Sequence, residues 1–342
     1  MQKKNSLEII RGGMLTSLQD LGRLGYQKYG VIVSGAMDSC ALRLANLLVG
    51  NEEGEATLEI TILGPVLQLK KNTLFAITGG DLSPTIDGKP VPLQRPVYTK
   101  EDCRLSFGSC RQGCRAYLAV AGGFAIPAVM GSKSTYIRAG IGGFRGRALQ
   151  SGDVLPIGEM APEIENFAGR LTAGRAVSFA TTSWFAGWQP GLSEAGPIRV
   201  TRGSQFNWFN EASQNKFFNE TYEITAESDR MGYRLQGPLL ERKIKREMIS
   251  ESLLWGTIQI TNEGSPIILL ADRQTAGGYP RIAQVAQADL PRLAQMPAGS
   301  SLRFQEISLM EAEQLYLQRE AYIRQMKAAI AFYRQKTKAV CA

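Results

Sequence analysis

The densest set of reactive and hydrogen-bonding side chains in this sequence directly follows the apolar run 266–270. A carboxylate, a guanidinium, an amide and a hydroxyl succeed one another at Asp272, Arg273, Gln274 and Thr275. The apolar run predicts a short buried strand, and unpaired polar groups are costly to bury at the end of such a strand. Glycines that follow allow the backbone to turn or to approach a ligand closely. The segment therefore predicts a binding or catalytic site.

The candidate site combines groups for catalysis with hydrogen-bond donors for a substrate. The catalytic candidates are Asp272, Arg273 and Glu251, and the substrate-binding candidates are Gln274, Thr275, Gly277, Gly278, Tyr279, Ser250, Gln259 and Arg230. Asp272 and Arg273 also fit a paired turn that supports the fold. Ser250 and Glu251 also fit ordinary capping at the entrance of a strand. Both interpretations stay open at this stage.

The absence of histidine restricts the chemistry further. It excludes the Ser-His-Asp and Cys-His nucleophile systems and the common zinc sites. Acid–base steps must use Asp, Glu, Lys, Tyr or Cys, and anions must be bound by Arg, Lys or backbone N–H groups. The five cysteines show no paired CxxC spacing, so we expect free thiols and no metal site.

Composition and charge indicate a protein of the cytoplasm. The chain has 342 residues and a formal net charge of +8, which is modest for this length. Its longest apolar stretch, 116–131, is interrupted by glycines and by Pro127 and is too short to cross a membrane. The N-terminus is too polar for a signal peptide, and no helix-turn-helix or RNA-binding pattern is present. We expect neither a membrane nor a nucleic acid as partner.

The two halves of the sequence carry similar motifs in the same order. An aspartate, an arginine and a Gly-Tyr pair occur within 20–26 and again within 229–233. The strand pattern around Glu59 is matched by the pattern around Gln259, so these two residues occupy equivalent places. In each half a short apolar run follows. Motifs repeated in constant order predict one duplicated β-rich unit.

We therefore predict a mainly β protein with two tandem barrel-like domains and a C-terminal helix. Short apolar runs bounded by Gly, Pro and Asp turns are typical of barrels or sandwiches. The expected domains are residues 1–190, 191–306 and, for the helix, 307–342, and the Gly- and Pro-rich segment 184–197 is the expected linker. Apolar residues spaced by three, four and seven predict that the tail is amphipathic. It either docks on a partner or, as we favour, packs on its own domain.

Two other segments are candidates for binding an anion. Ser34, Gly35 and Met37 precede a predicted helix, whose N-terminus attracts negative charge, although N-capping explains them better. The string GSKST at 131–135 is similar to a phosphate loop but lacks the first glycine of the Walker pattern.

Five strings together resemble the carboxyltransferase/allophanate-hydrolase subunit 2 family. They are SLQDLGR at 17–23, GVIVSGAMD at 30–38, AGG at 121–123, GSKST at 131–135 and DRQTAGGYP at 272–280. The resemblance runs in order from about residue 9 to residue 304 and leaves out the C-terminal helix. It implies two cyclophilin-like β-barrel domains, in agreement with the duplication.

The resemblance also implies an activity. A free-standing chain of this kind is expected to join two other subunits, A and the homologous, KipI-like B, in an ATP-dependent 5-oxoprolinase complex, which hydrolyses 5-oxo-L-proline to L-glutamate. Magnesium would accompany ATP, and the nucleotide site could belong to a partner subunit. A lactam is a poor electrophile, so phosphorylation of its carbonyl oxygen would precede attack by water. Arg273, Arg281 and Arg230 would then supply positive charge, and Asp272, Asp229 or Glu251 would position water.

Two other functions stay open. A regulatory protein that sequesters its KipI-like B partner needs a docking face but no intact site. Biotin-dependent carboxyl transfer, as in urea amidolyase-type relatives, needs a carrier. The chain has no biotinyl-lysine hairpin, because Met326 and Lys327 fall in the predicted tail helix, so biotin would have to arrive on another chain.

Overall fold

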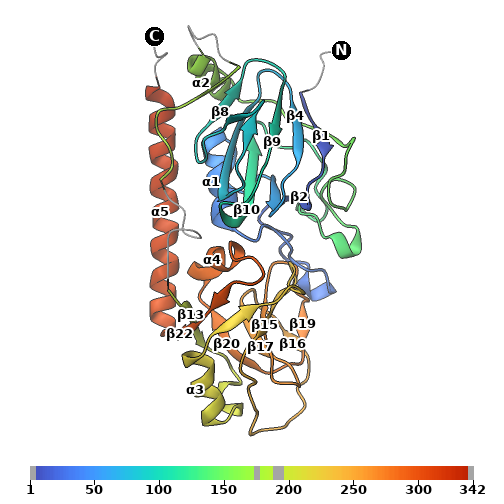
Figure 1. The fold of residues 1–342 in the computed structure, drawn as a ribbon, viewed down its shortest axis with the longest axis vertical. Helices are drawn as coiled ribbons and strands as arrows, with labels where there is room; N and C mark the ends of the chain where they lie inside the picture. Colours follow the sequence, from blue (N-terminus) through green and yellow to red (C-terminus); the bar gives the residue numbers. More distant parts are fainter. Residues whose placement is uncertain (1–4, 173–177, 188–195, 338–342) are drawn as a thin grey trace.

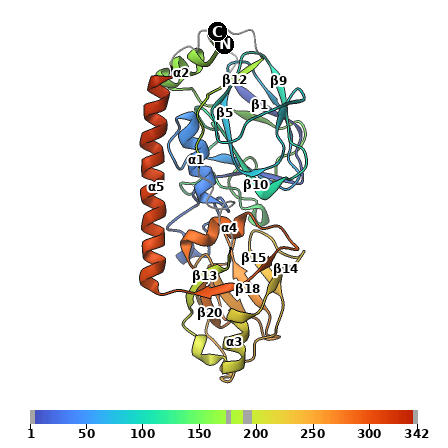
Figure 2. The ribbon, with the colours of Figure 1, turned by 60° about the vertical axis from the view of Figure 1, so that its left-hand side comes forward.

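The computed structural model describes residues 5–172, 178–187 and 196–337. Two β-rich lobes are stacked end to end, and one long helix runs along the side of both (Figures 1 and 2). The first lobe contains the described residues up to 187, and the second lobe contains residues 196–306. The predicted mainly β class and the C-terminal helix are confirmed. The predicted linker 184–197 lies partly outside the described residues.

Two six-stranded sheets form the first lobe. The first sheet has the order β11 (Val154–Pro156), β1 (Ser6–Arg11), β4 (Val66–Leu69), β9 (Cys103–Ser106), β6 (Thr85–Ile86) and β7 (Lys89–Pro90). The second has the order β12 (Phe179–Thr181), β8 (Val97–Thr99), β5 (Leu74–Asp81), β10 (Gln112–Val120), β3 (Thr57–Thr61) and β2 (Leu15–Gln19). Apolar side chains of both sheets form one core, which includes Leu7, Leu58 and Leu118.

The second lobe contains one eight-stranded sheet and a two-stranded ribbon. The large sheet has the order β21 (Ser301–Leu302), β14 (Tyr222–Ile224), β15 (Gly232–Gln236), β18 (Pro266–Leu269), β17 (Thr257–Ile260), β20 (Arg281–Val285), β13 (Ile198–Arg202) and β22 (Phe304–Glu306). The ribbon pairs β16 (Glu251–Ser252) with β19 (Ala276–Gly277). The lobes differ in the number and order of their strands, so the sheets do not test the predicted duplication. The duplication and the domain boundaries therefore stay predictions.

Helices cover the sheets and connect the lobes. They are α1 (Ser39–Val49), α2 (Pro162–Thr172), α3 (Glu211–Asn219), α4 (Leu290–Ala294) and α5 (Leu309–Lys336), with 3₁₀ turns η1 (Gln27–Tyr29), η2 (Ile137–Ala139), η3 (Phe206–Trp208) and η4 (Gln287–Asp289). No helix in the described ranges is long and apolar enough to span a membrane. Cys40, Cys103, Cys110 and Cys114 are free thiols, and Cys341 lies outside the described residues.

Helix α1 forms where the sequence predicts a capped helix. The Asp38 carboxylate accepts a hydrogen bond from the backbone N–H of Ala41 at 2.9 Å, and Gly50 ends the helix in a left-handed conformation. The N-cap is thus Asp38 rather than Ser34. Nine of the eleven helical residues are buried, because α1 packs between the second sheet of the first lobe and α5.

The C-terminal helix α5 contacts both lobes rather than a single domain. It packs against α1 in the first lobe and against β13 and η4 in the second. Ile323 and Ile330 are its buried residues, and polar contacts add to its attachment. Arg43 donates from Nη1 to both carboxylate oxygens of Glu320 at 2.9 Å. The helix therefore holds the two lobes in one arrangement, which positions the residues between them.

Candidate functional site

The loop between β18 and β20 gathers most of the predicted substrate-binding residues in the second lobe. Glu251 pairs with Gly277 across the β16–β19 ribbon. A Cβ atom at Gly277 would lie 3.0 Å from Gln274 Nε2 and 3.3 Å from Gln259 Nε2, so two amide groups converge on this glycine. Gln259 Nε2 also donates to the Tyr279 carbonyl at 3.2 Å. We call the segment 273–279 with Gln259 the donor loop.

The remaining predicted residues have different surroundings. Thr275 is half-buried, and its carbonyl accepts a hydrogen bond from Leu253 N–H at 3.0 Å. Ser250 is exposed, with its hydroxyl 3.7 Å from where a Cβ atom of Gly278 would lie. Thr275 is thus part of the donor loop, whereas Ser250 lies beside it.

Asp272 and Arg230 instead lie in a buried ionic cluster between the lobes. Arg230 donates to Asp272 from Nε at 2.9 Å and from Nη2 at 3.0 Å. Its Nη1 pairs with Glu59 of the first lobe. Ser34 of the first lobe donates its hydroxyl to Asp272 at 2.7 Å. We call Ser34, Glu59, Arg230 and Asp272 the inter-lobe cluster.

Strand geometry explains why Glu59 is in this cluster. Leu58 and Ile60 on β3 enter the core of the first lobe, so Glu59 between them faces the opposite side, toward the second lobe. Its Oε2 accepts hydrogen bonds from Met37 N–H and from the Tyr117 hydroxyl, both at 2.8 Å. In the sequence, Glu59 stands out as a charged residue inside an apolar strand pattern. Tyr117 sits in an apolar strand pattern without any such signal and was missed.

The two carboxylates of the inter-lobe cluster compensate the charge of Arg230. Burial lowers the pKa of Arg230, but Asp272 and Glu59 more than offset this effect and raise the pKa above its ordinary value. Arg230 Nη2 also donates to the Gly35 carbonyl at 2.6 Å. Both Asp272 oxygens already accept hydrogen bonds. In this arrangement, the Asp272 carboxylate is better suited to position Arg230 than to transfer a proton.

The charge of Arg273, by contrast, is not compensated by an ion pair within the described residues. Its residue surface is only 9% exposed, and no carboxylate in the described part of the chain lies within ion-pair distance of it. Nε donates to the Leu253 carbonyl and Nη1 to the Leu270 carbonyl, both at a long 3.3 Å. Burial lowers the pKa of Arg273 to about 10, although Asp272 acts in the opposite direction. A buried guanidinium without a counter-ion is suited to receiving an anionic group.

Glu251 is less free than the sequence indicated. Its carboxylate pairs with Arg281, and Arg281 Nε also donates to Gln205 Oε1 at 3.3 Å. Of the three arginines considered as cations, Arg230 and Arg281 are therefore engaged with carboxylates, and Arg273 is not. The predicted catalytic roles of Asp272, Arg273 and Glu251 stay predictions, but the geometry favours Arg273 as the group that meets a ligand.

The loop 131–135 binds a carboxylate of the chain itself. Asp20 Oδ2 accepts a hydrogen bond from Lys133 N–H at 2.6 Å, and Oδ1 accepts one from the Ser132 hydroxyl at 2.7 Å. Ser134 donates its hydroxyl to Asp20 Oδ1 as well. Asp20 therefore takes up hydrogen-bond donors of this loop, which serve the chain's own carboxylate.

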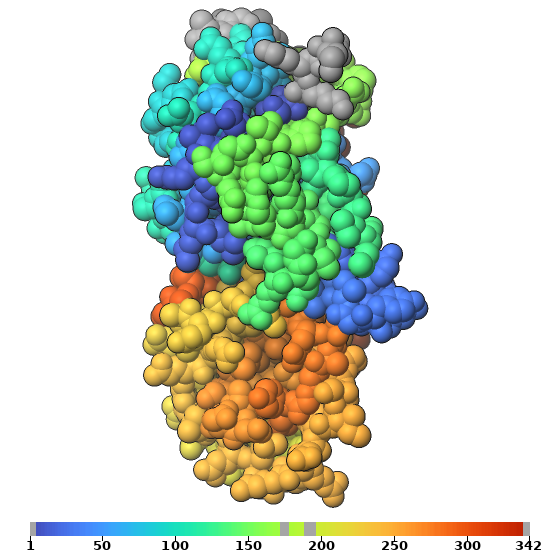
Figure 3. All heavy atoms as spheres, turned by 90° about the vertical axis from the view of Figure 1, so that its right-hand side faces the viewer, coloured from blue at the N-terminus to red at the C-terminus, as the bar shows by residue number. Residues whose placement is uncertain are grey.

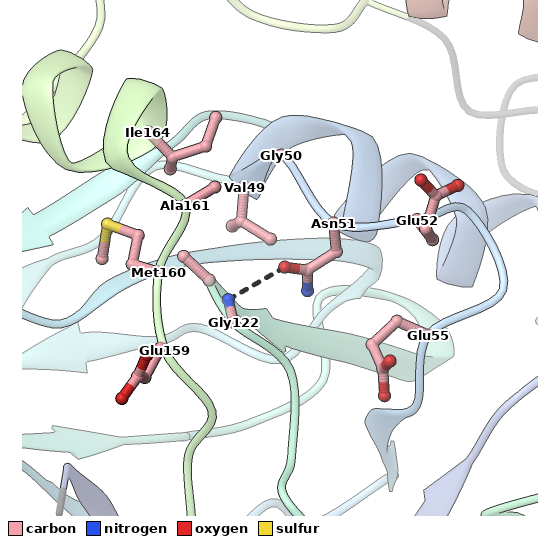
Figure 4. Close-up of a pocket in the computed structure, with 11 residues that line it drawn as sticks. Val49, Gly50, Asn51, Glu52, Glu55, Gly122, Glu159, Met160, Ala161 and Ile164 are labelled. Carbon is pink, nitrogen blue, oxygen red and sulfur yellow. Dashed lines mark hydrogen bonds between the residues drawn. The ribbon is translucent and has the colours of Figure 1, made fainter.

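A separate pocket of about 220 Å³ lies in the first lobe near the end of α1 (Figure 4). Glu52, Glu55 and Glu159 are among its lining residues. Asn51 Oδ1 accepts a hydrogen bond from Gly122 N–H at 3.0 Å, and Glu55 pairs with Lys133 at 2.6 Å. Its lining includes no residue of the inter-lobe cluster or the donor loop.

Known proteins similar to this chain include a family model, sequence relatives and solved structures. Residues 29–306 match the family described as carboxyltransferase domain, subdomain A and B. The chain is 39% identical to the C subunit of 5-oxoprolinase from Escherichia coli strain K12, over 94% of this chain and 97% of that protein. It is 33% identical to urea amidolyase of Saccharomyces cerevisiae over 94% of this chain but only 18% of that protein. The crystal structure of the K. lactis urea amidolyase superimposes with a TM-score of 0.83 at 31% identity, covering 95% of this chain and 20% of that one.

Proposed function

The chain belongs to the carboxyltransferase domain family, and on this premise we propose that it is the C subunit of an ATP-dependent 5-oxoprolinase complex. The complex would hydrolyse 5-oxo-L-proline to L-glutamate, and its other two subunits would be A and the KipI-like B. One observation carries the proposal: the similarity to the C subunit of E. coli 5-oxoprolinase extends over nearly the whole of both chains. The free thiols suit a reducing cytoplasm as its compartment.

The donor loop supports a role in binding the lactam. Opening a five-membered lactam requires positive charge and hydrogen-bond donors where negative charge develops on oxygen. Arg273 supplies a cation that no carboxylate of the described chain neutralises, and Gln274 and Gln259 supply amide N–H groups beside Gly277. The inter-lobe cluster fixes the chain just before Arg273, because Asp272 is held by Arg230 and Ser34. We assign substrate binding to the donor loop and positioning to the cluster.

We propose that ATP and its magnesium bind in a partner subunit. The loop 131–135 is filled by Asp20, so it does not fit a phosphate group. In the described ranges, no group of three acidic or cysteine side chains is arranged to hold a metal ion. The phosphorylated lactam would then reach the donor loop at a boundary between subunits.

Carboxyl transfer is the second candidate function. The family description and the similarity to urea amidolyases favour it, and a biotin carrier would have to come from another protein. Biotin-dependent carboxylation of a small amide by the chain with a biotinylated carrier would support this alternative. The regulatory alternative, in which the chain sequesters the KipI-like partner, predicts a tight complex without turnover.

Glutamate release from 5-oxoproline tests the proposal. The chain would be mixed with its purified A and B partners and ATP, alongside Arg273→Met and Asp272→Ala variants. Arg234→Met, which removes an exposed arginine of the same lobe, is the matched control. We expect activity only in the full mixture, retained by the control and lost with Arg273→Met. A tight but inactive wild-type complex would overturn the proposal in favour of the regulatory alternative.

A further inference from the structure

The donor loop lies open on one face of the second lobe. Figure 1 places β16 and β19 on the right-hand side of this lobe, and Figure 3 shows that face, where the orange part of the chain reaches the surface. Gln274 is exposed, Tyr279 is 39% exposed and Thr275 is half-buried. A small molecule can therefore reach the donor loop from this face.

Leu253 connects the guanidinium of Arg273 with the amide donors of the donor loop. Its carbonyl accepts the hydrogen bond from Arg273 Nε at 3.3 Å, and its N–H donates to the Thr275 carbonyl at 3.0 Å. Its Cδ1 would lie 2.8 Å from a Cβ atom at Gly277, the glycine on which the two glutamine amides converge. The cation and the neutral donors therefore adjoin the same buried leucine and belong to one site.

Arg273 keeps one nitrogen for a ligand. Nε and Nη1 donate to the backbone carbonyls described above, whereas Nη2 has no hydrogen-bond partner among the described residues. Nη2 is also not one of the polar atoms that are both unpartnered and fully enclosed, unlike Nη1 of Arg23 and Nε of Arg115. It therefore borders accessible space, although the residue is only 9% exposed. Guanidinium groups form strong, directed hydrogen bonds with carboxylates and phosphates.

The charge balance around the donor loop favours a carboxylate over a phosphoryl group. Arg230 and Arg281 are engaged with carboxylates of the chain, so Arg273 is the one of these three cations that is left for a ligand. A phosphoryl group carries more than one negative charge and is usually held by several cations and magnesium. A single guanidinium instead matches the single charge of a carboxylate.

A permanent charge on the ligand suits Arg273 better than a charge that develops during the reaction. An unpaired buried cation destabilises the free chain, and pairing with an anion removes this penalty. Negative charge on the lactam oxygen develops only in the transition state, so it does not pair with Arg273 when the substrate first binds. 5-Oxoproline, however, carries a permanent carboxylate on the ring carbon beside its nitrogen.

We propose that Arg273 binds the carboxylate of 5-oxo-L-proline and thereby selects acidic lactams over neutral ones, an assignment that rests on the proposed function. The amides of Gln274 and Gln259 would then meet the lactam oxygen. Binding of the carboxylate orients the ring for reaction at its other end, so a lactam without this group loses turnover as well as affinity. The phosphoryl charge is left to the partner subunit that holds magnesium.

Steady-state kinetics of the assembled complex with two substrates test the proposal. The substrates are 5-oxo-L-proline and its neutral amide, in which a carboxamide replaces the carboxylate, and the ring-opened product of each is measured. Wild type should prefer the acid about 100-fold or more in kcat/KM, because the amide leaves Arg273 unpaired. Arg273→Met should reduce this preference to about tenfold or less by slowing the reaction of the acid alone. The control Arg234→Met, at an exposed arginine of the same lobe, should keep the full preference.

An Arg273→Met complex that slows both substrates equally, with an unchanged melting temperature, would place Arg273 at the lactam carbonyl and overturn the proposal. An unchanged preference would overturn it as well. In both cases, glutamate release by wild type leaves the proposed function standing. A wild-type complex that releases no glutamate would remove the proposed function and this assignment together. Arg273→Gln, which also removes the charge, gives the same comparison if Arg273→Met does not assemble.

Discussion

Arg230 and Arg273 are two buried arginines of the same lobe with opposite electrostatic surroundings. Arg230 is paired with Glu59 and Asp272, and these carboxylates raise its pKa. Among the described residues, Arg273 makes long hydrogen bonds to backbone carbonyls and no ion pair, and burial lowers its pKa to about 10. An uncompensated buried charge destabilises a fold. Arg230, whose charge is paired, therefore fits a structural role, and Arg273, whose charge is not, fits a functional one.

The largest effect on stability is expected from breaking the inter-lobe cluster. Glu59→Ala leaves Arg230 with one carboxylate and removes the acceptor for the Met37 N–H and the Tyr117 hydroxyl. We expect the free energy of unfolding to fall by about 3–5 kcal/mol, as for other broken buried ion pairs. Urea denaturation measures this change. A loss below about 1 kcal/mol would show that the cluster does not hold the lobes together.

Asp38 extends the comparison to a buried acid. Burial raises the pKa of Asp38 to about 6, against hydrogen bonds from Ala41 and Gln295. The folded protein then keeps a proton that the unfolded chain releases near pH 4, so stability should fall as pH rises between about 4 and 6. The shift corresponds to about 3 kcal/mol. The difference in unfolding free energy between wild type and Asp38→Asn should change by this amount across that range, and a constant difference would contradict the shift.

Gly277→Ala perturbs the donor loop without touching the cluster. The new Cβ atom would lie 2.8 Å from Leu253 Cδ1 and 3.0 Å from Gln274 Nε2, so these side chains must move. We expect a loss of about 1–3 kcal/mol of stability from overpacking and a higher KM for 5-oxoproline in the assembled complex. Gly169→Ala is the control, since its Cβ atom would meet no atom within 4 Å. An unchanged KM would remove the donor loop from substrate binding.

The smallest effect is expected at the ion pair between α1 and α5. Arg43 and Glu320 are partly exposed, with 17% and 18% of their side-chain surfaces accessible. Glu320→Gln should lower the free energy of unfolding by about 0.5–1 kcal/mol, because such pairs are screened by water and salt. The loss should shrink in high salt. A larger, salt-independent loss would show that α5 depends on this pair more than on Ile323 and Ile330.

Local patterns predicted the fold better than the site. Alternation and turn residues identified the β-rich class, and capping residues before a helical pattern indicated the start of α1, although its N-cap is Asp38 rather than Ser34. The string 272–280 led to the site because polar residues follow a buried strand there. No local rule, however, predicts that Ser34 and Glu59 of one lobe meet Asp272 and Arg230 of the other.

Pairing across the lobes also separated residues that are adjacent in the sequence. Asp272 turns toward the first lobe, whereas the guanidinium of Arg273 reaches the carbonyls of Leu253 and Leu270 in the second. The sequence alone cannot tell which of two neighbouring charged residues forms an ion pair, since their environments depend on which segments pack against them. The same limit applies to Glu251 on β16, which pairs with Arg281 on β20.

Arg273→Met tests the central contrast most directly, when unfolding free energy and glutamate release are measured on the same variant. If Arg273 is kept for a ligand, its replacement by an apolar side chain of similar length should leave stability unchanged or raise it by about 1–2 kcal/mol. Turnover of the assembled complex should fall about 100-fold or more. A variant that loses stability as Glu59→Ala does, yet turns over normally once folded, would show that Arg273 is structural and would contradict the account.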